Sequence, residues 1–367
     1  MLGITALTGV AFFVYSSTVT TDIKVQNNLV IEKNDAPQEQ NLENNFATSS
    51  SDILPELEEY SDSVPHIFFH SLIIYPEKAA SDVKNSDGYK NNMITVDQFK
   101  IILQQLYENN FILIDSQLLY SFDENGSVTK PTLYIPKGKR PLVLSVDDLS
   151  YNSYLKNGGF ADKLVLEEGI VKTEVLTPEG NKIMTNDGDV VPIVDEFVKA
   201  HPDFSLNGAK GIIGLTGFEG IFGYRTQLLG ERGDNERKSA IVVVDALKKT
   251  GWTFANHSYS HRHEDFLQGT ISTASLAKDI SLWIEQVEPL VGQTDIFIGP
   301  FGQVFKDGDP RRTQLINAGF NILYGVGMDG YTKYFKNYIV MNRVDIDGYR
   351  LTHNAERLNN MFGLNLK

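Results

Sequence analysis

The chain of 367 residues lacks cysteine altogether, and basic residues are scarce in it. The missing thiols exclude disulfides, thiolate zinc sites and cysteine nucleophiles. The 33 basic residues face 47 acidic ones, for a net charge of −14. This imbalance argues against nucleic acid and against an anionic membrane surface as main partners, and it is compatible with a neutral or cationic polymer. No glycine-rich phosphate loop follows the early predicted strands, so the sequence gives no support for nucleotide binding.

The N-terminal region lacks charge and then lacks apolar residues. Residues 2–21 contain no charged side chain, and about 20 apolar residues suffice to cross a bilayer core. Export signals usually have a basic segment before the apolar stretch, and none precedes this one. A buried helix or strand is therefore the alternative. Residues 22–63 are rich in Asn, Gln, Glu and Ser, a composition typical of disorder. We expect a membrane anchor or signal segment over 1–21 and a disordered tether over 22–63. The domain that follows, 64–367, is then expected on the extracellular face of the cell membrane or secreted.

Strands and helices alternate through most of the predicted domain. The apolar run at 64–74 predicts a strand, and 96–115 predicts an amphipathic helix, a turn and a strand. Further strands are expected at 140–148, 208–217, 252–256, 295–302 and 320–326. Helices are expected at 191–202, at 236–249 with Gly251 as terminator, at 275–290 and from Arg311. This order is typical of a parallel sheet with crossover helices, either a barrel or an open doubly wound sheet.

Residues 152–190 interrupt this alternation. Pro178, Glu179 and Gly180 predict a turn between two short alternating runs, and hence an inserted β-hairpin. Because the insertion follows a strand that ends in two aspartates, it is either a wall of a substrate site or surface decoration.

The segment FANHSYSHRH, residues 254–263, contains three of the seven histidines. His257 and His261 are four residues apart and directly follow a predicted strand, as Asp147 and Asp148 end another. The carboxyl ends of parallel strands converge on one face of such folds. Two histidines and one aspartate form a three-ligand zinc set that leaves a position for water, and the second aspartate is then free to act as a base. The sequence alone does not decide which aspartate is which. His263 is expected to be a solvated loop residue, since a fourth protein ligand would close the site.

Four motifs resemble those of the polysaccharide deacetylases, the family with the NodB homology domain. Ser145-Val146-Asp147-Asp148 is similar to its T-F-D-D motif, and His257–His261 matches its H-[ST]-x-x-H motif in full. Residues 298–302, IGPFG, are similar to its R-x-P-[FY]-G motif, and Leu351-Thr352-His353 is similar to its Leu-x-His motif. The opening PHIFFHSL at 65–72 also resembles the start of many members. The resemblance covers roughly residues 64–353.

The resemblance implies a distorted (β/α) barrel with about seven parallel strands and a metal-dependent deacetylase. Asp147 would be the general base, and Asp148, His257 and His261 would bind the divalent metal, Zn²⁺ or else Co²⁺. The backbone N–H of Phe301 would stabilise an oxyanion, and His353 would protonate the leaving group. Pro300, Tyr259 and His70 are expected to contact substrate. The implied substrate is an acetylated polysaccharide such as peptidoglycan or poly-N-acetylglucosamine, with an N- or O-acetyl group.

One element of the family pattern is missing, because Ile298 replaces the arginine that orients the base. Arg343 follows a late strand that, in a barrel, returns beside the first one, so it is predicted to reach Asp147 in its place. Arg225 is the second candidate, and pairing of Arg343 with Asp345 or Asp347 on the surface is the alternative. A catalytically inactive glycan-binding relative and a different metal-dependent hydrolase are the competing functions. The oligomeric state is left open.

Overall fold

The computed structural model describes residues 55–156 and 158–365. The expected membrane segment 1–21 and most of the expected tether therefore lie outside the described residues. Among the residues described, no helix combines the length and the apolar character that spanning a bilayer requires.

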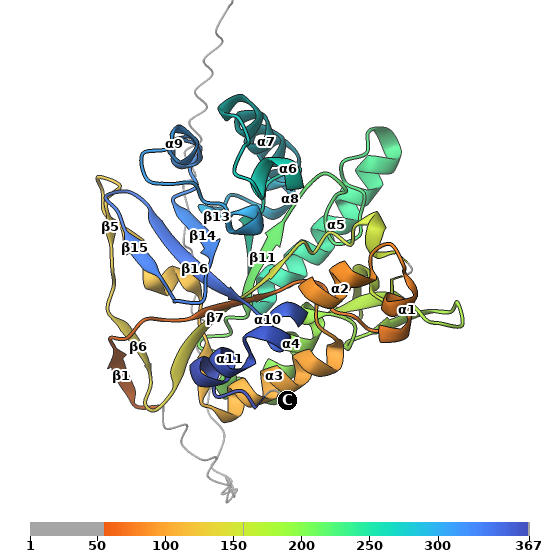
Figure 1. Ribbon diagram of the computed structural model, residues 1–367, viewed down its shortest axis with the longest axis horizontal. Helices are drawn as coiled ribbons and strands as arrows, with labels where there is room; N and C mark the ends of the chain where they lie inside the picture. The colour runs from red at the N-terminus through yellow and green to blue at the C-terminus, as the bar shows by residue number, and fades with distance from the viewer. Residues whose placement is uncertain (1–54, 157, 366–367) are drawn as a thin grey trace, which may run out of the picture. The chain divides into compact units, whose positions relative to one another are not determined.

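Seven parallel strands close into a ring, and most of them are labelled in Figure 1. In ring order they are β2 (His66–Phe69), β7 (Arg140–Asp147), β11 (Gly211–Leu215), β12 (Trp252–Asn256), β13 (Ile296–Ile298), β14 (Ile322–Val326) and β16 (Ile339–Asp345). The pairing of β16 with β2 closes the ring, which confirms the expected barrel and excludes the open sheet. The barrel is distorted, because β12 and β13 pair only at Asn256 and Phe297.

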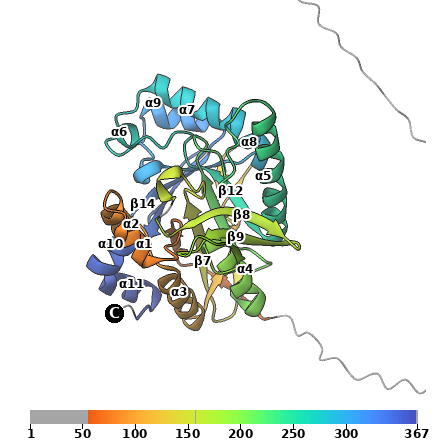
Figure 2. The same ribbon diagram turned by 90° about the vertical axis from the view of Figure 1, so that its right-hand side faces the viewer.

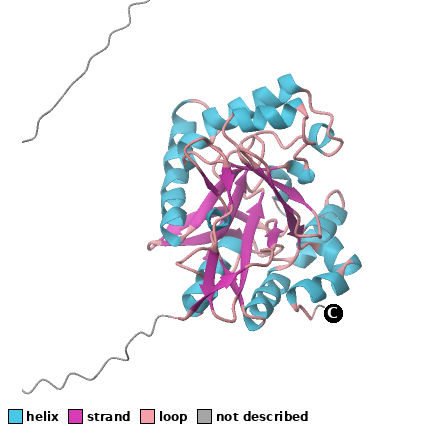
Figure 3. Ribbon diagram, turned by 90° about the vertical axis from the view of Figure 1, so that its left-hand side faces the viewer, coloured by secondary structure: helices cyan, strands magenta, loops and turns pink. Residues whose placement is uncertain are grey.

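Helices surround the strands on the outside (Figure 3). The longer ones are α3 (Val96–Glu108), α4 (Val190–Ala200), α5 (Gly230–Thr250), α7 (Thr273–Gln286), α9 (Pro310–Asn317) and α11 (Ala355–Phe362). The shorter ones are α1 (Pro76–Ser81), α2 (Ser86–Asn92), α6 (His263–Phe266), α8 (Glu288–Val291) and α10 (Gly348–His353). Gly251 ends α5 with a φ of 100°, as expected of a glycine cap. The helix begins six residues before the expected start at 236. Its first turns are polar, so apolar periodicity did not indicate them.

Inside the barrel, side chains change from apolar to polar along each strand. Alternate residues of a strand point to the same side, so Val143, Ser145 and Asp147 of β7 share the interior face. Val143 lies in a buried apolar cluster. The barrel-strand members of that cluster also include Ile212, Ile296, Ile298, Ile322, Tyr324, Ile339 and Met341. Ser145 and Asp147 lie nearer the carboxyl end of β7, and polar chemistry is therefore concentrated at that end of the barrel.

The insertion at 152–190 is larger than the predicted hairpin. β9 (Ile170–Leu176) and β10 (Lys182–Thr185) form the hairpin around residues 178–180, and β8 (Ala161–Glu167) adds a third antiparallel strand. β8 and β9 lie against α5 (Figure 2). At the end of the insertion Asp189 is fully buried, and its carboxylate accepts hydrogen bonds from the Leu72 and Val190 N–H groups and the Tyr151 hydroxyl. One buried carboxylate thus joins the insertion to the barrel.

A strand lies before residue 64, the expected start of the domain. β1 (Leu57–Tyr60) pairs with β6 (Leu133–Pro136), within the range predicted as disordered tether. The sequence of this strand, LEEY, is polar and did not indicate a strand. Its backbone hydrogen bonds to β6 and the packing of Tyr60 hold it in place. The remaining strands lie outside the ring: β3 (Phe111–Leu113), β4 (Ser121–Phe122), β5 (Val128–Thr129) and β15 (Thr332–Tyr334).

Candidate active site

A cavity of about 680 Å³ lies at the carboxyl ends of the barrel strands. Asp147, Asp148, His257, His261 and Arg343 all line it. The sequence places these residues on three separate strands or on the loops directly after them. Closure of the barrel brings them together, as the convergence of parallel strand ends predicts.

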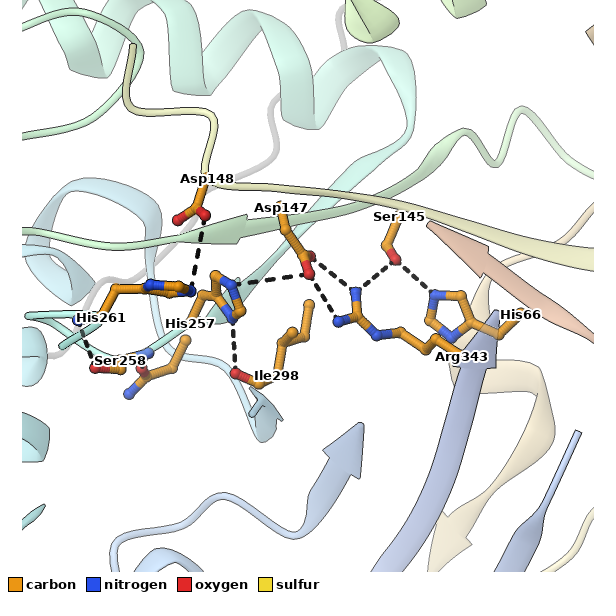
Figure 4. A network of polar contacts seen from close by, with 10 residues as sticks. His66, Ser145, Asp147, Asp148, His257, Ser258, His261, Ile298 and Arg343 are labelled. Carbon is orange, nitrogen blue, oxygen red and sulfur yellow. Dashed lines mark hydrogen bonds and ion pairs between the residues drawn. The ribbon is translucent and has the colours of Figure 1, made fainter. Parts of the chain in front are cut away.

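The two adjacent aspartates occupy different environments. Asp147 is the last residue of β7 and is only 1% exposed, whereas Asp148 has left the strand with a φ of 58° and is partly exposed. The left-handed conformation turns the chain, so the two carboxylates are not on opposite faces of one strand but face the same cavity (Figure 4). Gly214 on the neighbouring strand makes room for this arrangement, because a Cβ there would lie 2.8 Å from Asp147 Oδ1.

Arg343 forms a bidentate ion pair with Asp147. Its Nη1 donates to Oδ1 at 2.8 Å and its Nη2 donates to Oδ2 at 2.7 Å, and Arg343 is 1% exposed. Burial alone would raise the pKa of Asp147, but Arg343 and His257 hold it below its ordinary value. The predicted contact is therefore present, with Arg343 reaching the carboxylate from β16, close to β2 and β7 in the ring. Arg225 instead donates to the carbonyl oxygens of Ser150, Tyr151 and Glu219.

Asp148, His257 and His261 form a candidate metal site. One potential ligand atom from each residue lies within 4.8 Å of the others, and Asp148 Oδ2 is 3.7 Å from His261 Nε2. Ligand atoms of a tetrahedral zinc site are separated by roughly 3.4 Å, so small side-chain rotations suffice. Asp148 Oδ1 is buried without a hydrogen-bond partner in the described part of the chain. A divalent cation would satisfy it, and the residues present thus fit such an ion.

The hydrogen bond of His257 fixes which ring nitrogen is free. Nδ1 lies 2.8 Å from the carbonyl oxygen of Ile298, and a carbonyl only accepts, so Nδ1 carries the proton. Nε2 then has a free lone pair directed toward the cavity. Burial lowers the pKa of His257, which favours the neutral form that metal binding requires.

The two histidines belong to a tightly bonded loop rather than a helix. Ser258 and His261 have φ values of 62° and 46°, and Ser258 Oγ accepts a hydrogen bond from the His261 N–H. The Asp279 carboxylate on α7 accepts from the N–H groups of Tyr259 and Ser260. These bonds hold His257 and His261 on the same side, with ring centroids 4.8 Å apart.

Phe301 forms part of the cavity rim. The residue has a φ of 55° and is 44% exposed, and its ring contacts the rings of His261 and His263 at centroid distances of 4.8 and 5.3 Å. The turn is closed by hydrogen bonds from the N–H groups of Gly302 and Gln303. The N–H of Phe301 makes neither of these bonds, so within the described residues neither closing bond prevents it from donating to a ligand.

Not every expected residue reaches the cavity. His70 and the exposed His263 line it. The described lining does not include Pro300, which is buried, or Tyr259, whose hydroxyl donates to Gln286 Oε1. His353 is also outside this lining: its Nδ1 bonds the Tyr349 carbonyl oxygen, and its ring stacks on Tyr349 at 4.2 Å. A helix, α10, begins directly after β16 and carries His353 onto its own surface.

Sequence reasoning missed other residues near Asp147. His66 is buried, and its ring bonds Ser145 in the layer behind the ion pair. Asn152 and Tyr154 of the insertion also line the cavity, as does Phe218 after β11. The alternation Ser145-x-Asp147 was the one signal in the sequence that placed Ser145 beside the site.

Comparison with known proteins gives distant structural likenesses only. No family model matches the chain, and no curated protein matches it. A Streptococcus pyogenes deacetylase, PplD, in complex with acetate is similar over 82% of this chain and 98% of its own, with 13% identity and a TM-score of 0.47. The BpsB deacetylase domain from Bordetella bronchiseptica is similar over 58% of this chain and 74% of its own, with 12% identity and a TM-score of 0.31. With TM-scores below 0.5 these likenesses carry no weight, and function has to be inferred from the site and its motifs.

Proposed function

We propose that this protein is a metal-dependent hydrolase that removes acetyl groups from an extracellular or cell-wall polysaccharide. The observation that carries the proposal is the combination of the Asp148–His257–His261 cluster with the buried Asp147–Arg343 pair in one open cavity. Such a set can hold a cation and activate water, which supports hydrolysis. That the substrate is an acetylated glycan is inferred from the resemblance of residues 145–148 and 257–261 to the deacetylase motifs.

Each residue has a distinct part in the proposed reaction. Asp148 and the Nε2 atoms of His257 and His261 would hold the ion, Zn²⁺ or Co²⁺. A divalent cation would polarise the acyl carbonyl and lower the pKa of water beside it. Asp147 accepts the proton of the attacking water, and Arg343 keeps its carboxylate ionised and oriented. The Phe301 N–H donates to the oxygen that becomes negative.

The proton on Asp147 can then pass to the leaving group. Arg343 makes Asp147 a weak base but, once protonated, a strong acid, since it holds the pKa of Asp147 below its ordinary value. Asp147 can therefore supply the proton for which His353 was predicted, and His353 does not line the cavity. His70, Tyr154 and Phe301 line the cavity where the rest of the glycan would lie.

Acetate release from a panel of N- and O-acetylated glycans tests this function. We expect release that chelator abolishes and that added Zn²⁺ or Co²⁺ restores, with His263→Ala as an active control. A wild-type protein that binds metal but releases no acetate from any glycan would contradict the proposal and favour an inactive glycan-binding relative.

Location is a separate proposal. The uncharged residues 2–21 and the polar residues after them support a domain held outside the cell. Protease shaving of intact cells should degrade the domain, whereas protection until lysis would contradict export.

A further inference from the structure

A row of buried hydrogen bonds extends behind the Asp147–Arg343 pair (Figure 4). Arg343 Nη1 also donates to Ser145 Oγ at 3.0 Å, and Ser145 Oγ lies 2.8 Å from His66 Nε2. Asp147, Arg343, Ser145 and His66 are each at most 4% exposed. They come from β16, β2 and β7, which are neighbours in the ring. The row is therefore shielded from bulk solvent, and Arg343 Nε and His66 Nδ1 have no hydrogen-bond partner among the described residues.

Chemistry sets the direction of the Arg343–Ser145 bond, and that direction in turn bears on the bond between Ser145 and His66. A guanidinium only donates, so Ser145 Oγ accepts from Arg343. The hydroxyl proton of Ser145 then needs an acceptor, and His66 Nε2 is the other partner that Ser145 Oγ contacts. His66 would therefore accept at Nε2 and carry its proton on Nδ1. Burial, followed by the charge of Arg343, holds the pKa of His66 well below its ordinary value, in keeping with a neutral ring that can accept.

This row limits the movement of the guanidinium. The two bonds to Asp147 alone would let Arg343 and the carboxylate turn together. The third bond, to Ser145, fixes Arg343 to β7, the strand that also carries Asp147. Without an acceptor at His66, the Ser145 hydroxyl would rotate among its staggered positions and face Arg343 with a lone pair only part of the time.

We propose that His66, acting through Ser145, is a positioning residue that holds Arg343 and so aims the Asp147 carboxylate at the attacking water. This inference rests on the proposed hydrolase function. A small error in the aim of a general base lowers turnover without weakening substrate binding. The role thus predicts an effect on kcat with KM and metal content unchanged.

A pair of amide substitutions tests the role of Nε2. The amide of glutamine reaches the place of His66 Nε2, whereas that of asparagine reaches only the place of Nδ1. We expect His66→Gln to keep kcat within about threefold and His66→Asn to lower it about tenfold or more. Ser145→Ala, a smaller change, should lower kcat as His66→Asn does. Equal kcat in the two amide variants, or an unchanged kcat in Ser145→Ala, would overturn the proposal.

A double-mutant cycle separates positioning from general packing. In an Arg343→Lys background the fork is lost, so adding His66→Asn should lower kcat no further. Tyr324→Phe is the control for the surroundings of His66, because the Tyr324 and His66 ring centroids are 4.6 Å apart and the Tyr324 hydroxyl is not part of the row of hydrogen bonds. It should leave kcat unchanged. Additive losses in the cycle, or a loss in Tyr324→Phe equal to that in His66→Asn, would contradict the role.

Nitrogen NMR of histidine-labelled wild-type protein tests the bond direction without using activity. The His66 signals, identified by their loss in His66→Gln, should show an unprotonated Nε2 and a protonated Nδ1. A proton on Nε2 would overturn the proposal. If the wild type releases no acetate, the hydrolase function fails, and the NMR result still decides whether Ser145 donates to His66.

Discussion

The two halves of the candidate site differ in backbone, burial and hydrogen bonding. The half around Asp147 lies on regular strands, and Asp147, Arg343, Ser145 and His66 are at most 4% exposed. The half around Asp148 lies on loops. Asp148, Ser258, His261 and Phe301 there all have positive φ values between 46° and 62°, which is strained for residues other than glycine. The first, which we call the closed half, is thus buried and regular. The second, which we call the open half, is strained, and in it Asp148, His261 and Phe301 are partly exposed while His257 and Ser258 are buried.

The difference shows which partners each half already has. Asp147 accepts two hydrogen bonds from Arg343, so its charge is balanced within the protein. Asp148 Oδ1 is buried without a partner in the described residues, and the His257 Nε2 lone pair faces the cavity. The Asp147 carboxylate is therefore paired within the protein, whereas Asp148 and His257 present ligand atoms that a cation would pair.

Removing a histidine from the open half should have the largest effect. His257→Ala or His261→Ala leaves two ligands, so we expect loss of tight metal binding and of acetate release. His263→Ala is the matched control, since His263 lines the same cavity outside the ligand cluster. Metal analysis after dialysis measures the result. Equal zinc stoichiometry in wild type and His257→Ala would show that the open half is not a metal site.

Changes in the closed half should separate activity from metal binding. Asp147→Asn should keep the metal and lower kcat by at least about 10².

Arg343→Ala should lower kcat more than tenfold and, because it leaves a carboxylate buried without its partner, lower the free energy of unfolding by about 3–5 kcal/mol. Metal content, kcat and denaturant unfolding measure the three effects, with Arg225→Ala as the arginine control. Loss of metal in Asp147→Asn would mean that the halves are not separate.

The sequence predicted the residues that meet in the site but not the hydrogen bonds behind Asp147. Asp147, Asp148, His257 and His261 follow strands, and parallel strand ends converge, so their meeting was predictable. Arg343 was predictable because barrel closure returns the last strand to the first. The bond between His66 and Ser145 was not, since alternation gives the side of a strand but not the register between β2 and β7. His353 was misplaced because three residues of motif do not reveal that α10 begins at Gly348.

Asp189 is a buried carboxylate that, unlike Asp147, is not paired with an arginine, so its pKa should shift in the opposite direction. Burial raises its pKa to about 6, despite hydrogen bonds from Val190, Tyr151 and Leu72. Between the ordinary value near 4 and about 6, the folded protein therefore binds a proton that the unfolded chain has lost. Stability consequently falls as pH rises through this window, by up to about 3 kcal/mol, and above it this loss remains without further change with pH.

Asparagine at position 189 removes this titration while keeping the shape of the side chain. Its carbonyl oxygen can accept from Leu72 and Val190, and its amide can donate to Tyr151. The wild type should therefore lose more stability than Asp189→Asn between pH 4 and pH 7, in denaturant unfolding at both values. Parallel pH profiles of the two proteins would contradict a raised pKa.

The smallest expected effect concerns backbone strain in the open half. Phe301→Ala and Phe301→Gly both remove the ring contacts with His261 and His263, so the two variants differ mainly in backbone freedom. At a φ of 55° alanine keeps the strain and glycine relieves it. Glycine also gains entropy in the unfolded chain, which opposes the benefit. We expect the relief to prevail, with Phe301→Gly more stable than Phe301→Ala by about 1 kcal/mol in denaturant unfolding. The same pair at Phe68, on the regular strand β2, is the control, and glycine should be the less stable there. If Phe301→Gly were no more stable than Phe301→Ala, the left-handed conformation of Phe301 would not be a source of strain.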